Sequence, residues 1–433
     1  MARQTRSYRI DRAARLLAFV TLALAPAVRA EPDEALLGRS ANYPIGSATG
    51  NVFNWNQNPY RVGSWSAMDQ VPGMVVRPVA KAAQAQPLPP MAAPPVIRYT
   101  FEGRSYTLAD YLERRRTTGL LILKDGQIVA EHYRYGRKED ARFISFSMAK
   151  SVTSLLVGAA ASRGLLKLDD KAETHVPALA GSAYGGTTLQ QLLRMGSGLR
   201  FTERYDGNDD IARLSRAVSG RPGAGTAIDV LRSIEARHSP PGEKFVYASA
   251  ETEVLGRVLA AATGRNLAEL TREWLWQPMG AEHDAFWQVG ADGQEQAYGG
   301  FNASLRDWGR LGLLLAQDGR RGPPDQPLQV LPQAYLLDAT SAERQPAAFR
   351  PRTATPFFGY GYQFWLLPGP SRAFTLQGIH GQMIYVWPAG NLVLVHTAAY
   401  EAASALAGGE ALKPYLELGA LWQAVTQALG STR

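Results

Sequence analysis

Ser147 and Lys150 stand three residues apart, and they are the first candidates for chemistry in this chain. Positions i and i+3 share one face of a helix, so the serine hydroxyl and the lysine amine can come within hydrogen-bonding distance. A serine hydroxyl becomes a good nucleophile when a neighbouring base takes its proton, and a lysine serves as that base when burial keeps it neutral. The pair therefore predicts a nucleophilic serine with a lysine base.

The segment that carries this pair has the periodicity of a helix. From Met148 onward apolar residues recur with helical spacing, and Gly164 ends the pattern. The free N–H groups at the start of such a helix face the place where an oxyanion would form. The alternative is a helix N-cap serine followed by an exposed lysine one turn later. Ser147 and Lys150 form the only S-x-x-K motif in the chain.

Two further segments supply candidate partners for the serine. Tyr247-Ala248-Ser249 follows a Pro-Pro-Gly turn, and a tyrosine beside a lysine can carry a proton to a leaving group. Gly378-Ile379-His380-Gly381-Gln382 opens a strand near the C-terminus, and the N–H of Gln382 is expected to be the second oxyanion donor beside that of Ser147. The structural alternatives are a half-buried tyrosine and a plain β-bulge.

The elements around these motifs predict an α+β fold. Two strand-like runs, 120–124 and 127–135, are joined by the hairpin signal Asp125-Gly126 and lead into the serine helix. Helical patterns fill the middle of the chain, and strand-like runs return from about residue 361, before a last helix at about 412–429. We therefore expect a central antiparallel sheet flanked by helices, with a mainly helical insert at about 166–290, in a domain spanning 98–433.

The N-terminal part is expected to be separate from this domain. Residues 1–30 carry arginines, then the apolar run 16–28, then Val28-Arg29-Ala30, a pattern typical of a secretory signal peptide. Residues 31–97 are expected to form an arm and an Ala/Pro-rich linker. We thus expect a periplasmic or secreted protein with no stable membrane span after cleavage of the signal. The alternative for residues 1–30 is an anchoring helix.

Composition and missing motifs narrow the chemistry. The formal charge of +8 falls to +3 once the six arginines and one aspartate of residues 1–30 are removed, so nothing favours a nucleic-acid partner. The chain has no cysteine, which excludes a thiol nucleophile. It also lacks the G-x-S-x-G, H-E-x-x-H, P-loop and dinucleotide-binding motifs, and its six histidines lack ligand spacing. No cofactor or metal is expected.

The three ordered motifs resemble those of the serine β-lactamase and penicillin-recognising superfamily, most of all the 6-aminohexanoate-dimer hydrolases and related esterases. The resemblance covers roughly residues 98–398 and implies a β-lactamase/transpeptidase-like fold. It also implies that Ser147 is acylated, that Lys150 is its base or base partner, that Tyr247 shuttles the proton, and that Ser249 extends this network.

The resemblance suggests further site residues and two departures. Tyr205, on the loop 201–210, is expected to line the substrate cleft, and Asn302 to contact the substrate; the alternatives are a solvated loop and a helix cap. Ser249 stands where the lactamases usually carry Asn. Ile379-His380-Gly381 stands where they carry Lys or His, then Thr or Ser, then Gly, and a register one residue later makes His380 the cation beside Gly381.

These observations predict an exported serine hydrolase that cleaves an amide bond, similar to that of 6-aminohexanoate oligomers, through an acyl-enzyme. Its partner would be a small-molecule amide or ester. The alternatives are a carboxylesterase, a β-lactamase or a D-amino-acid peptidase on the same fold, or a non-catalytic penicillin-binding-like module.

Overall fold

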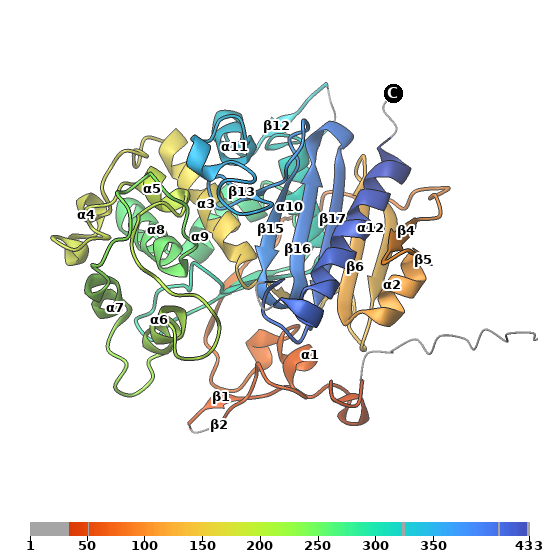
Figure 1. Ribbon diagram of the computed structural model, residues 1–433, viewed down its shortest axis with the longest axis horizontal. Coiled ribbons are helices and arrows are strands. Elements are labelled where there is room, and N and C mark those ends of the chain that lie inside the picture. Colours follow the sequence, from red (N-terminus) through yellow and green to blue (C-terminus); the bar gives the residue numbers. More distant parts are fainter. Residues whose placement is uncertain (1–33, 51, 323–324, 406–407, 431–433) are drawn as a thin grey trace, which may run out of the picture.

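The computed structural model describes residues 34–50, 52–322, 325–405 and 408–430 (Figure 1). The predicted signal peptide, residues 1–30, lies outside the described residues. In the part of the chain that is described, no helix combines the length and hydropathy that a membrane crossing needs.

A seven-stranded antiparallel sheet forms the centre of the molecule. In spatial order its strands are β13 (Gly359–Tyr360), β14 (Trp365–Leu366), β15 (Phe374–Gly378), β16 (Gln382–Trp387), β17 (Leu392–Ala398), β6 (Thr117–Lys124) and β7 (Gln127–Tyr133). Pairing of β17 with β6 joins the C-terminal strands to the predicted hairpin. The predicted antiparallel α+β fold is confirmed.

Strand β6 is buried from Thr117 to Leu123 because both of its faces are covered. Successive side chains point to opposite faces of a strand. Leu121 and Leu123 belong to the core on the side of α10 (Leu305–Ala316), which packs on β6, β16 and β17. Leu120 and Ile122 belong to the core under α12 (Lys413–Leu429) on the other face. The sheet is therefore the middle of three layers, with α12 in front in Figure 1.

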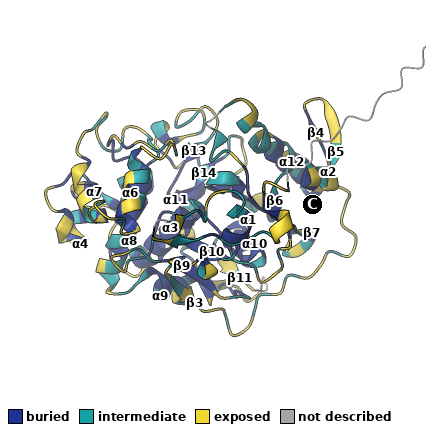
Figure 2. Ribbon diagram, turned by 90° about the horizontal axis from the view of Figure 1, so that it is seen from below, coloured by how far each residue is buried: buried dark blue, intermediate teal, exposed yellow. Residues whose placement is uncertain are grey.

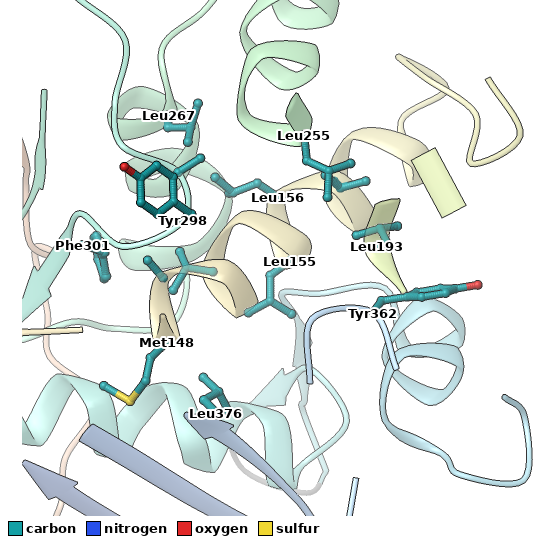
Figure 3. Packing of buried hydrophobic residues seen from close by; sticks show 14 of the residues in the cluster. Met148, Leu155, Leu156, Leu193, Leu255, Leu267, Tyr298, Phe301, Tyr362 and Leu376 are labelled. Atoms are coloured by element: carbon teal, nitrogen blue, oxygen red, sulfur yellow. The ribbon is translucent and has the colours of Figure 1, made fainter. Parts of the chain in front are cut away.

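Helix α3 (Met148–Ser162) lies in the core beside the sheet, packed against α8 (Ser249–Thr263). The sequence predicts one apolar stripe, but the structure buries every face of this helix from Met148 to Ala160 (Figure 2). Small residues allow this close packing: Gly158 faces the ring of Tyr335. Figure 3 shows Met148, Leu155 and Leu156 pointing into side chains from several other elements.

The rest of the predicted insert forms a lobe of short helices on the left of the sheet in Figure 1. These helices are α4 (Ala172–His175), α5 (Leu189–Leu193), α6 (Asp210–Val218), α7 (Ala227–Ser233) and α9 (Leu267–Thr271). The pattern at 211–237 predicts mostly helix, whereas the structure divides it into α6 and α7. Gly220, Gly223 and Gly225 between them all have positive φ, a conformation that interrupts a helix.

A second, four-stranded sheet links the arm to the domain. Its order is β3 (Val76–Val79), β9 (Ala285–Gln288), β10 (Phe301–Ala303) and β8 (Phe143–Ile144), all antiparallel. The arm before β3 contains the short hairpin β1 (Ala48–Thr49) and β2 (Val52–Phe53) and the helix α1 (Arg61–Ser64). It lies below the domain in Figure 1. Residues 80–97 are mostly irregular and return toward the main sheet, where Met91 N–H donates to Ile128 O over 2.8 Å.

Candidate active site

A sharp turn delivers Ser147 to the start of α3. Strand β8 ends at Ile144, and the Ser145 N–H then donates to Phe301 O in the neighbouring strand over 2.9 Å. Phe146 has a φ of 43°, in the left-handed region that a bulky residue rarely adopts. Ser147 follows with a φ of −67° and directly precedes the helix. A strained turn fixed by β-sheet hydrogen bonds therefore sets the direction of the serine side chain.

The amine of Lys150 is buried against Ser147. Lys150 is only 1% exposed, and its Nζ lies 2.8 Å from Ser147 Oγ and 2.9 Å from Tyr298 O. Burial lowers the pKa of Lys150 to about 8, and the negative charge of Glu203 opposes part of this shift. At pH 7 about one Lys150 amine in ten is therefore neutral. A neutral amine donates to Tyr298 O and keeps a lone pair for the serine proton.

Tyr247, two positions before the start of α8, is the third residue at this site. Its hydroxyl is hydrogen-bonded to the Ser147 side chain, and Lys150 Nζ lies 5.1 Å from the centre of its ring. The ring stacks on Trp365 with centroids 5.4 Å apart, which fixes its plane. Burial raises the pKa of Tyr247 well above 10, and the charge of Glu203 adds to the shift, so the phenol is protonated. Lys150, three positions along the chain, and Tyr247, a hundred positions along it, thus converge on the Ser147 hydroxyl.

Ser249 is hydrogen-bonded to the carboxylate of Glu203 and, among the described residues, has no hydrogen bond to Lys150 or Tyr247. Its hydroxyl donates to Glu203 Oε1 and its backbone N–H to Glu203 Oε2, both over 2.8 Å. Ser249 was expected to extend the Lys150–Tyr247 network, and it reaches this network through Glu203, whose charge acts on both residues. Glu203 lies close enough to compete for the hydroxyl proton. A carboxylate is a stronger acceptor than a phenol oxygen.

The C-terminal glycine motif lies beside the nucleophile turn. A Cβ on Gly378 would lie 2.2 Å from Ser145 O, so only glycine lets β15 approach this closely. Ile379 borders the cavity that contains Ser147, whereas Gln382 does not. The Gln382 side chain is buried and its Nε2 donates to Ala398 O over 2.8 Å within the sheet; the backbone N–H, the expected oxyanion donor, takes no part in this bond. Gly381 is also buried, with a φ of 90° and the Tyr400 ring packed against it. Of the residues in this turn, Ile379 lines the cavity and Gln382 and Gly381 do not, so a bound ligand would meet Ile379.

His380 is not a cation in this structure. Its ring packs on Trp65 and Phe146, with centroids 4.8 and 5.7 Å away, and its Nδ1–H donates to Tyr400 O over 2.8 Å. Burial lowers the pKa of His380 to about 4, and the charge of Arg61 acts in the same direction. The reading of His380 as a carboxylate-binding cation is therefore wrong, because desolvation disfavours its charged form.

The two remaining candidates differ in position. Tyr205 lines the cavity, and its hydroxyl donates to Glu203 Oε1 over 2.7 Å. Asn302 does not reach the cavity: it lies fully buried in β10, where its Nδ2 donates to Gly300 O over 3.0 Å. Its side chain is not part of the cavity lining, and the expectation that Asn302 contacts the substrate stays a prediction.

The cavity itself has a volume of about 690 Å³ and is walled by several distant segments. The arm contributes residues of 48–75, the loop 203–207 and helix α6 form another side, and residues 288–299 close it. The lining combines apolar and aromatic side chains with polar and charged ones. Among the described residues no group of three or more acidic or histidine side chains could hold a metal ion.

The fold and this site define a β-lactamase/transpeptidase-like protein with a serine at the start of the core helix. The beta-lactamase family profile matches residues 107–407, which is most of the chain. The chain belongs to the beta-lactamase family and is a hydrolase of that family, acting on amide or ester bonds.

Relatives and solved structures agree with this assignment. The chain is 27% identical to a 6-aminohexanoate-dimer hydrolase of Paenarthrobacter ureafaciens over 83% of this chain and 91% of the relative. It is similar to the structure of a putative 6-aminohexanoate-dimer hydrolase from Bacillus anthracis, with a TM-score of 0.75, 24% identity, and coverage of 89% of this chain and 98% of the other. A putative beta-lactamase from Bacteroides dorei DSM 17855 gives a TM-score of 0.58 at 20% identity, over 75% and 97% of the two chains. At these sequence identities, the similarity to the two solved structures shows a shared fold.

Three residues of the site could not be predicted from the sequence: Glu203, Trp365 and Tyr298. Glu203 stands two positions before Tyr205, in the loop 201–210 that was expected to line the cleft. The sequence pointed to this loop but not to the Glu203 carboxylate. Trp365 and Tyr298 act through ring stacking and a backbone carbonyl, respectively, and neither carries a signal in the sequence.

Proposed function

We propose that this protein is a serine hydrolase that cleaves a linear amide bond through an acyl-enzyme formed on Ser147. One observation carries the proposal: the 2.8 Å contact between Ser147 Oγ and a lysine amine whose pKa burial lowers to about 8. A lysine with an unshifted pKa would be protonated and unable to take the proton from the serine.

In the proposed acylation, Ser147 Oγ attacks the carbonyl carbon while its proton moves to Lys150 Nζ. The carbonyl oxygen becomes an oxyanion, which accepts hydrogen bonds from the Ser147 N–H and from an N–H of the turn 379–382. Tyr247 then gives its phenol proton to the leaving nitrogen and regains a proton from Lys150, whose amine lies beside its ring. The carbon–nitrogen bond breaks, the amine leaves, and an ester to Ser147 remains.

Deacylation uses the same groups in the opposite direction. Lys150 and Tyr247 take a proton from a water molecule, whose oxygen attacks the ester carbon. The Ser147 oxygen leaves and takes up that proton, which restores the free enzyme and releases the acid. Each proton that leaves the serine or the water is returned, so the cycle needs no cofactor or metal.

For the second oxyanion donor we propose the N–H of Ile379 in place of that of Gln382. The support is that Ile379 borders the cavity beside Ser147 and that Gly378 holds this turn against Ser145. A donor must lie at the position of the oxyanion to stabilise it, and Gln382 lies in the strand beyond the turn.

The amide preference and the place of action are also part of the proposal. The similarity to a 6-aminohexanoate-dimer hydrolase over most of both chains favours an aliphatic amide over a β-lactam. The neutral His380 supports this choice, because it leaves the turn without the cation with which lactamases bind a carboxylate. The pattern of residues 1–30 supports export to the periplasm or the medium.

Active-site labelling combined with turnover tests the central claim. We expect a fluorophosphonate probe to label the wild-type protein, with the adduct located on Ser147 by peptide mass spectrometry. Ser147→Ala should lose both labelling and hydrolysis of the 6-aminohexanoate dimer and p-nitrophenyl esters. Ser151→Ala is the matched control, since this serine lies one turn further along α3 and bonds Gln363 O.

Each outcome of this experiment is informative. Retained hydrolysis by Ser147→Ala contradicts the assignment of the nucleophile. A folded wild-type protein that takes up no probe and cleaves no substrate favours the non-catalytic module. Cleavage of esters or nitrocefin without cleavage of the dimer keeps the acyl-enzyme and replaces the amide preference with esterase or β-lactamase activity.

A further inference from the structure

Three charged side chains line the cavity beside Ser147: Glu203, Arg216 and Arg221. The two arginines are neighbours at the end of α6, where the Arg221 N–H donates to Arg216 O over 2.9 Å. They lie where α6 meets the arm, because Arg221 sits over the ring of Phe53 at 4.1 Å. This part of the cavity wall therefore carries two positive charges.

Both guanidinium groups are held in place without an acidic partner. Arg216 Nη1 donates to Gly207 O over 2.9 Å, and Arg221 Nη1 to Gly50 O over 3.4 Å. Within the described residues neither arginine forms an ion pair with a carboxylate, although many other arginines of this chain do. A guanidinium has five N–H donors, so each keeps several free for a ligand.

Glu203, the remaining charge, is not available to bind an opposite charge on the substrate. Its two oxygens already accept from the Ser249 hydroxyl and N–H and from the Tyr205 hydroxyl. It also lies close enough to Lys150 and Tyr247 to affect their pKa values. The cavity therefore has a satisfied carboxylate near the nucleophile and unpaired arginines on the arm side.

We propose that Arg216 and Arg221 bind a carboxylate at one end of the substrate. The substrate would then be an aliphatic amide or ester with an anionic terminus, and its chain would lie along apolar lining residues such as Met74, Val75, Val218 and Val289. Arginine forms paired hydrogen bonds with a carboxylate, so two arginines suit this group better than a neutral or cationic one. This proposal rests on the proposed function, because it assumes that the chain enters the cavity beside Ser147.

Binding to the Ser147→Ala variant tests the site without turnover. Calorimetry would compare four amides of similar length: N-hexyladipamic acid and N-hexanoyl-6-aminohexanoate, which carry a carboxylate on the acyl or the amine side, neutral N-hexylhexanamide, and cationic N-hexyl-6-aminohexanamide. We expect at least one anionic amide to bind about tenfold more tightly than the neutral one, and the cationic amide to bind no better than the neutral one. The gain should shrink as salt is raised.

Substitutions in the Ser147→Ala background assign the effect to the arginines. Arg216→Gln with Arg221→Gln should remove the tenfold gain and leave the binding of the neutral amide unchanged, which also shows that the cavity is intact. Arg213→Gln is the matched control, since this exposed arginine lies on the same helix, outside the cavity lining, and bonds Ser233.

The proposal is overturned if neither anionic amide binds more tightly than the neutral one, or if Arg213→Gln has the same effect as the double variant. A charge preference that depends on Arg216 and Arg221, in a protein whose Ser147 takes up no fluorophosphonate, would support the anion site and count against the proposed hydrolase.

Discussion

The Glu203 carboxylate holds Ser249 by two hydrogen bonds, one from the backbone N–H and one from the hydroxyl, each 2.8 Å long. This contact ties the loop 201–210 to the first turn of α8, directly after Tyr247. It also places a negative charge where it raises the pKa of Lys150. The same carboxylate therefore supports the geometry of the site and opposes part of the fall in the pKa of its amine, which burial causes.

The activity of the wild-type protein should depend on pH through Lys150. The reaction needs the neutral amine, and burial lowers the pKa of Lys150 to about 8. We expect kcat/KM to rise about tenfold per pH unit below pH 8 and to level off above it, because one proton must be lost. Initial rates with a p-nitrophenyl ester between pH 5.5 and 10 would measure this profile. A profile already flat from pH 6 contradicts the role of Lys150 as the base.

Glu203→Gln should shift the rise of kcat/KM with pH to lower pH. The negative charge of Glu203 favours the protonated amine, so its removal lowers the pKa of Lys150 further. Glutamine keeps an acceptor for the Ser249 hydroxyl, which limits the structural damage. The same pH series, with the exposed Glu235→Gln as control, gives the shift. If the rise of kcat/KM stays at the same pH or moves to higher pH, Glu203 does not act on Lys150.

Tyr247→Phe should lose most of its activity but little stability. Phenylalanine keeps the ring that stacks on Trp365 and loses only the hydroxyl that is hydrogen-bonded to Ser147. A positioned acid typically contributes 10²- to 10⁴-fold, so we expect kcat to fall by about that factor on an amide, with a Tm near that of the wild type. Tyr133→Phe, on the edge strand β7, is the control. Activity within about threefold of wild type would exclude a proton-transfer role.

Gly378→Ala should destabilise the protein and impair the site. The added methyl group would lie 2.2 Å from Ser145 O, so β15 or the nucleophile turn must shift. Overpacking of this kind costs about 1–3 kcal/mol, which lowers the Tm by several degrees. Gly186→Ala is a matched control, because its nearest neighbour would be 3.7 Å away and its φ is not positive. Thermal unfolding and kcat/KM measure both effects, and equal Tm values for the two variants would contradict the close approach of β15.

The sequence by itself determined the elements whose signals are local. Asp125-Gly126 between two apolar runs gave the hairpin of β6 and β7, and the helical spacing after Met148, ended by Gly164, gave α3. The S-x-x-K spacing placed Ser147 and Lys150 on one helix face, where the structure puts their side chains in contact. Each of these depends on neighbours in the chain, so a short stretch of sequence contains the whole cause.

The tertiary structure decided what depends on residues far apart in the sequence. The low pKa of His380 comes from burial and from the charge of Arg61, the partner of Ser249 is Glu203, and Asn302 is fully buried in β10. The depressed pKa of Lys150 likewise needs the burial that every face of α3 receives. Charge states and hydrogen-bond partners follow from desolvation and competing acceptors, and these arise only when the folded chain brings distant segments together.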